Sequence, residues 1–174
     1  MRVIRIGNKL ISTEKLDGVI DNILQLRVQG YSQAEVAGRL NVDRTFISRL
    51  EKLGEIRKGK RIAVIGFPIE NREELEAMLV EEGVEYAVLF TDKERWDFVE
   101  RTSGVDLLNS IMQIITDLRA CDAVVAIASN YRIRLCQALL DKEVIGVEIG
   151  KSPIEEDKYV SVDEIRDIIK YIIV

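Results

Sequence analysis

The segment Gln33–Lys52 constrains the fold of this chain more than any other. Its apolar residues recur every three or four positions in two groups, which is the spacing of two short helices. Asn41 lies between the two groups. They fall on one face of each helix: Val36, Ala37 and Leu40 on the first, Ile47 and Leu50 on the second. Asn41 lies where the chain must reverse, and Asn tolerates a positive φ better than most residues. The pattern predicts two helices that close a small apolar core across a tight turn.

The residues that flank these helices are helix-capping residues. Ser32 precedes the first helix and Glu35 follows three residues later, which is the spacing of a capping box. Asp43 precedes the second helix, and we expect its side-chain oxygen to cap that helix. Core pattern, turn residue and caps therefore all indicate a helix-turn-helix.

The sequence SQAEVAGRLNVDRTFISRLEKLG, with flanks from about Asp17 to Gly54, resembles the helix-turn-helix of phage-repressor-like (Xre-type) bacterial transcription regulators. In that family the second helix lies in the major groove of DNA. One departure is Asn41, where the family usually has Gly. The alternative is a solvent-exposed face in an ordinary helical hairpin. The resemblance implies a set of DNA-contacting residues: Asp43, Arg44, Thr45, Ser48, Arg49 and Lys52.

Charge is distributed unevenly along the 174 residues. The whole chain has 25 basic and 30 acidic residues, for a net charge of −5. Residues 1–60 contain 12 Lys or Arg and 7 Asp or Glu, whereas residues 61–174 contain 13 and 23. A basic first third before an acidic remainder favours a DNA-binding end joined to a domain with another role. The basic excess is small, so we expect weak, salt-sensitive non-specific binding.

Several residue types exclude whole classes of site. The chain has no His, which excludes His-ligated zinc and Ser-His-Asp triads. Its two cysteines, Cys121 and Cys136, form no CxxC pair and lie in apolar helical segments, so we expect buried, reduced thiols. No run of about 20 apolar residues indicates a membrane span. We therefore expect a cytoplasmic protein.

The first domain is expected to cover residues 1–56. Residues 3–12 alternate around Gly7-Asn8, which predicts a β-hairpin. Because isolated hairpins are marginally stable, we expect it to pack on the helical domain or on a partner subunit, with a DNA-contacting wing as the alternative. A helix is expected within residues 13–30. The charged segment 55–61 is the predicted connector, and its Arg57, Lys58, Lys60 and Arg61 are candidates for phosphate contacts.

The second domain, residues 61–174, alternates strands with helices. Strands are predicted at 62–67, 86–90, 123–128 and 144–149, with a short fifth at 158–161. Helices are predicted from Asn71 (with Glu74 as a capping-box partner) to Gly83, and at 105–119, 131–141 and 162–173. This order indicates an α/β fold: a mostly parallel sheet, Rossmann-like or flavodoxin-like, with helices on both faces.

Open parallel sheets bind ligands beyond the carboxyl ends of their strands. The first such loop, GFPIEN, is neither GxGxxG nor a P-loop, so we reject a standard dinucleotide or NTPase site. Backbone N–H groups and a guanidinium near residue 130 would suit a phosphate or carboxylate. The alternative is that Ser129 or Asn130 only caps a helix. Asp92, Asp97 and Glu148 are candidate Mg²⁺ ligands, but three acidic residues on different loops are expected by chance in a chain with 30. No metal and no cofactor is therefore predicted. The candidate ligand site comprises Gly66, Phe67, Pro68, Ser129, Asn130 and Arg132.

Two further segments have open interpretations. Residues 91–104 form a long, charged connection in which Trp96 and Phe98 either cover the core or act as a lid. Residues 105–118 are apolar over a broad arc, which indicates either a deeply buried helix or a dimer seam.

The sequence favours a transcription regulator that binds double-stranded DNA as a homodimer and has a small-molecule effector. The sequence does not favour an enzyme, because it has no nucleotide-binding motif and no nucleophile with a nearby base. The alternatives are an α/β enzyme with an accessory DNA-binding module, and a dimerisation scaffold without a ligand.

Overall fold

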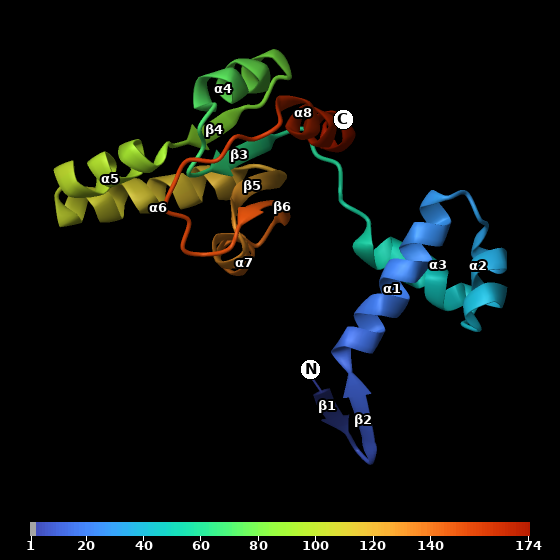
Figure 1. Cartoon of the computed structure of the whole chain (residues 1–174). Coiled ribbons are helices and arrows are strands. Elements are labelled where there is room, and N and C mark those ends of the chain that lie inside the picture. The colour runs from blue at the N-terminus through green and yellow to red at the C-terminus, as the bar shows by residue number, and fades with distance from the viewer. Residues whose placement is uncertain (1–2) are drawn as a thin grey trace. The chain divides into compact units, whose positions relative to one another are not determined.

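The computed structural model describes residues 3–174. The chain divides into two compact units after Glu55, and the second unit is Ile56–Val174. Within the described residues there are eight helices, a two-stranded sheet and a four-stranded sheet (Figure 1). The mixed α/β fold predicted from the sequence is confirmed at this level.

The first unit begins with the predicted hairpin. Strands β1 (Val3–Ile6) and β2 (Lys9–Ser12) pair antiparallel around Gly7, whose φ is +57°. The hairpin is not packed on the helices as one alternative expected. Its side chains are largely exposed, among them Ile6 at 64% and Leu10 at 74%.

Three helices follow: α1 (Thr13–Val28), α2 (Gln33–Leu40) and α3 (Arg44–Gly54). Each contributes one fully buried residue to a common core, namely Ile23, Val36 and Ile47. Half-buried side chains surround these three. They include the other apolar residues of the predicted pattern, Ala37, Leu40 and Leu50, and also Val42 from the turn. The small core predicted between the two motif helices is therefore present, and α1 completes it.

The turn and the first cap agree with the sequence, and the second cap does not. Asn41 adopts the left-handed conformation, at φ 52° and ψ 48°. Ser32 and Glu35 form both hydrogen bonds of the capping box. Asp43 has the backbone conformation of an N-cap, but its carboxylate makes no capping hydrogen bond. The N–H of Phe46, in the first turn of the helix, donates to the backbone carbonyl of Asp43 at 3.0 Å.

The second unit is built on a four-stranded sheet in which every neighbouring pair is parallel. The strand order is β4-β3-β5-β6, so the first strand of the unit lies between the second and the third. Their bounds are β3 (Ile62–Gly66), β4 (Tyr86–Leu89), β5 (Ala123–Ser129) and β6 (Glu143–Gly150). The fifth strand predicted at 158–161 is wrong, because Lys158 makes only an isolated bridge to Ile69.

Helices cover both faces of this sheet, as predicted (Figure 1). On one face, α4 (Arg72–Glu81) and α8 (Val162–Ile172) bury Leu75, Ile165 and Ile169 against the strands. On the other face lie α6 (Gly104–Ala120) and α7 (Asn130–Leu139). Because it is covered on both sides, β5 is buried along its whole length.

Two predictions are corrected, one about the segment after β4 and one about the cap of α4. The segment expected to be a long connection contains helix α5 (Asp92–Arg101), which begins with a capping box between Thr91 and Glu94. Asn71 precedes α4 but does not cap it. Its amide exchanges two hydrogen bonds with the backbone of Val160, and it thereby ties the start of α4 to the segment before α8.

Candidate nucleic-acid interface and strand-end crevice

The outward face of α3 carries the residues expected to contact DNA. Ile47 is fully buried and Leu50 is half-buried, which fixes the rotation of the helix about its axis. Residues on the opposite face then point to solvent, because side chains three or four positions apart share a face. Asp43 lies exposed just before the helix. The exposed residues of the helix itself include the five predicted there: Arg44, Thr45, Ser48, Arg49 and Lys52.

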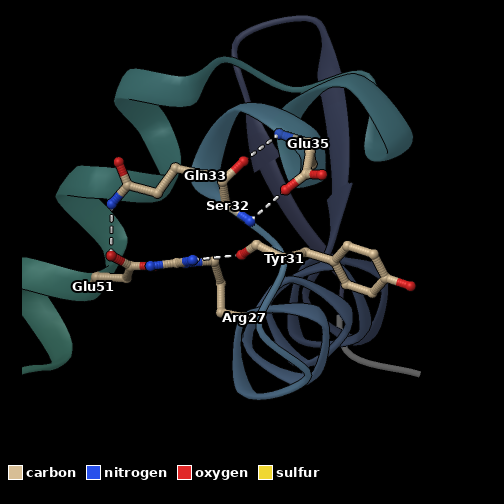
Figure 2. A network of polar contacts seen from close by, with 6 residues as sticks. All are labelled: Arg27, Tyr31, Ser32, Gln33, Glu35 and Glu51. Atoms are coloured by element: carbon tan, nitrogen blue, oxygen red, sulfur yellow. Dashed lines mark hydrogen bonds and ion pairs between the residues drawn. The ribbon is translucent and has the colours of Figure 1, made fainter.

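A polar network holds α3 against the two preceding helices (Figure 2). The Glu51 carboxylate accepts a hydrogen bond from Arg27 Nε and another from Gln33 Nε2, the latter at 2.7 Å. Arg27 also donates to the backbone carbonyl of Tyr31. One acidic side chain on α3 is thus bonded to both α1 and α2. The hydrogen bond from Arg27 and that from Gln33 hold the pKa of Glu51 below its ordinary value.

The basic side chains on the exposed face of α3 are not used in this network. Arg44, Arg49 and Lys52 have no ion-pair partner among residues 3–174, whereas Arg27 and Glu51 neutralise each other. The helix therefore offers three positive groups and two hydroxyls to solvent. Such a surface suits phosphates and the acceptor atoms of bases.

One of the connector residues proposed for phosphate contacts, Arg61, is already engaged within the second unit. The guanidinium of Arg61 forms two hydrogen bonds with Glu85, at 2.7 and 2.9 Å. Gly59 donates to the backbone carbonyl of Ile172, and a Cβ on Gly59 would approach Asp122 Cβ to 2.5 Å. The end of the connector is thus part of the second unit, and Arg61 already has a carboxylate partner.

The second unit has a crevice of about 530 Å³ beyond the carboxyl ends of β3 and β5. Phe67 and Pro68 follow β3, Ser129 ends β5, and Arg132 lies in the first turn of α7. These are four of the six residues predicted to bind a ligand, and all four line the crevice. The volume is within the range of about 300–1,000 Å³ typical of small-molecule sites.

The remaining two predicted residues have structural positions. Gly66 is buried within the sheet, where a Cβ would lie 3.0 Å from Leu89 and 3.1 Å from Ile127. Asn130 does not line the crevice, and its Oδ1 accepts hydrogen bonds from the backbone N–H groups of Tyr131 and Ser152. Ser129 both lines the crevice and caps α7 through the N–H of Arg132, as the alternative interpretation proposed.

Helix α5 provides a wall of the crevice that the sequence interpretation missed. Asp92, Arg95, Trp96 and Val99 all line it, together with residues 152–155 after β6. Arg95 donates to the Asp92 carboxylate at 2.6 Å. The guanidinium carbons of Arg95 and Arg132 each lie 5.8 Å from the centre of the Phe67 ring. The threonine and glutamate of the Thr91–Glu94 capping box were the signal that would have located this helix.

Neither the two cysteines nor the acidic residues of the described chain form a reactive centre or a metal site. Cys121 and Cys136 are free thiols, and desolvation raises the pKa of both. This environment suppresses the reactive thiolate form. Residues 3–174 contain no group of three Cys, Asp or Glu side chains arranged to hold a metal ion.

No protein-family model, curated protein or solved structure matches the chain. Over residues 3–174, no helix is both long enough and apolar enough to cross a bilayer.

Proposed function

We propose that the chain is a cytoplasmic transcription regulator of the phage-repressor-like type, which reads double-stranded DNA with α3. The observation that carries the proposal is the exposed face of this helix. It presents Arg44, Arg49 and Lys52 without carboxylate partners, while the opposite face is anchored by Ile47 and Glu51. A helix held firmly on one side and basic on the other suits docking into a major groove.

The second unit is proposed to sense a small molecule. Its strand order corresponds to the first four strands of the flavodoxin-like doubly wound order, in which ligands bind where the order reverses. That reversal lies between the ends of β3 and β5, where the crevice is found. The open crevice favours a ligand-responsive unit over a pure scaffold. Phe67 and Trp96, which would fill this space in a pure scaffold, line it instead.

The regulator is proposed to act as a homodimer, because paired recognition helices reach two successive major grooves. Helix α6 offers a surface for a second copy. Three apolar residues spaced three and four positions apart share one face of the helix: Val105, Leu108 and Met112. They are 71%, 60% and 55% exposed. This exposure contradicts a deeply buried α6 and supports the proposal of a dimer seam.

The test is a selection of bound sequences from a random duplex library with the full-length protein, followed by affinity measurements on the selected site. Two inverted half-sites about 10 base pairs apart are expected. Arg44→Ala and Arg49→Ala should each lower affinity for that site by about tenfold to a hundredfold and relax the preference at one position. Lys52→Ala should weaken all sequences alike and reduce the salt dependence.

The matched control is Arg101→Ala, which removes an exposed arginine from α5 in the second unit. It is expected to leave DNA affinity unchanged. The assignment of α3 is wrong if Arg44→Ala and Arg49→Ala behave like this control.

A further inference from the structure

We propose that the ligand of the second unit is an amphipathic organic anion. Its carboxylate or phosphate head would bind Arg95 and Arg132 in the strand-end crevice, and its hydrocarbon body would lie in an adjoining apolar groove. The inference deepens the ligand-sensing role proposed above, and it rests on that role only for its biological meaning.

The groove is a second cavity, of about 350 Å³, on the sheet face that α6 and α7 cover. Its walls are aliphatic and aromatic side chains, among them Ile111 from α6 and Leu135 and Leu139 from α7. These three remain 43%, 36% and 48% exposed, so the cavity between the helices is open to solvent. Apolar surface left open in this way gains free energy when a hydrocarbon covers it.

The crevice and the groove share one boundary. Phe67, Arg95, Val99 and Arg132 line both cavities. Arg95 and Arg132 are also the only charged side chains among the residues that line the groove. A molecule that extends from the groove into the crevice therefore passes between apolar walls and meets two guanidinium groups where it leaves them.

The charges at this boundary favour an anion. Arg132 has no carboxylate partner among residues 3–174, and its guanidinium rests near the Phe67 ring at 5.8 Å. Arg95 is paired with Asp92 at 2.6 Å but retains further N–H donors. Arginine donors bind carboxylate and phosphate oxygens through paired, charge-assisted hydrogen bonds. Of the acidic residues that line the crevice, Asp92 is already engaged, and neither Asp92 nor Glu155 lines the groove.

The chain contains a built-in reporter for this binding. Trp96 is its only tryptophan, and it lines the crevice beside Arg95. Titration of the full-length protein with decanoate or decyl phosphate, below their micelle concentrations, is expected to change Trp96 emission saturably. Decanol and decylamine carry the same chain without the negative charge, and inorganic phosphate and acetate carry the charge without the chain. All four are expected to bind at least about tenfold more weakly.

Matched variants locate the two halves of the site. Arg132→Gln should weaken decanoate at least about tenfold, because it removes the charge-assisted hydrogen bonds. Arg134→Gln, two residues along the same exposed helix, is the control and should have no effect. Arg134 bonds the backbone carbonyl of Asn130 and lines neither cavity. Ile111→Gln should weaken decanoate and leave the weak binding of phosphate unchanged. Circular dichroism of each variant verifies folding.

Relative affinities of decanoate and decyl phosphate decide which head group the site prefers. The proposal is overturned if decylamine or decanol binds as tightly as decanoate, if Arg132→Gln and Arg134→Gln behave alike, or if no probe binds saturably. It is also overturned if Ile111→Gln dissociates a dimer while no probe binds, since a second copy would then occupy the groove. None of these measurements contains DNA, so they fail or succeed independently of the assignment of α3.

Discussion

Replacement of Ile47 by alanine should destabilise the helical unit without affecting the α/β unit. Ile47 has no exposed surface and packs against Ile23 and Val36, which come from the other two helices. Truncation of a fully buried isoleucine costs about 2–5 kcal/mol. Alanine recovers up to about 0.7 kcal/mol through its higher helix propensity. The net loss of about 1.3–4.3 kcal/mol is large for a unit of this size, whose total stability is about 3–8 kcal/mol at typical values per residue.

The assay exploits the position of Trp96. It lies in the second unit, so its fluorescence reports that unit alone, whereas far-UV ellipticity reports helices of both. Urea unfolding of Ile47→Ala should shift part of the ellipticity change to lower urea and leave the fluorescence midpoint in place. Ile165→Ala is the matched control, because Ile165 is equally buried but belongs to the core beneath α8. It should shift the fluorescence midpoint.

The reasoning is refuted if Ile47→Ala moves the Trp96 transition as far as Ile165→Ala does. The two cores would then unfold as one. It is refuted equally if Ile47→Ala shifts neither signal, since the three-helix core would not stabilise the first unit.

Three further outcomes are expected. Asn41→Ala should lower the unfolding free energy of the helical unit by about 1 kcal/mol in the same urea assay, whereas Asn41→Gly should not, because alanine disfavours the left-handed conformation. The pKa of Glu51 is lowered in the folded protein, so its stabilisation is present above the unfolded pKa of about 4.3 and is lost as pH falls through the folded value. The difference in urea midpoint between wild type and Glu51→Gln should therefore be largest near neutral pH and vanish in acid; a constant difference contradicts this. Leu108→Lys on the exposed α6 surface should convert a dimer to a monomer by light scattering, while Val80→Lys should not, because Val80 is an exposed apolar residue of α4 on the other face of the sheet; identical masses for the two variants would exclude this surface as the seam.

Local sequence signals predicted most of the described elements, because their causes are local. The capping box of Ser32, the left-handed Asn41 and the apolar runs of β3 and β5 depend on residues within a few positions. The errors arose where a distant partner or a competing bond decides. Asn71 has the position of a helix cap, but the backbone of Val160, remote in sequence, takes its amide. The Asp43 carboxylate makes no capping bond, and the N–H of Phe46 donates to the carbonyl of the same residue.

The candidate ligand site was harder to predict than the fold because it depends on how elements pack. The sequence located the ends of β3 and β5, and four of the six named residues line the crevice. It named Arg132 but gave no physical reason to prefer it to Arg134, since both fall near the start of α7. The helix buries Ile133 against Gly146 of β6, where a Cβ on the glycine would lie 2.5 Å from the isoleucine. That contact fixes the phase of α7, and Arg132 then lines the crevice while Arg134 does not. The identity of the arginine available to a ligand is thus set by a glycine on a neighbouring strand, which no pattern within the helix itself contains.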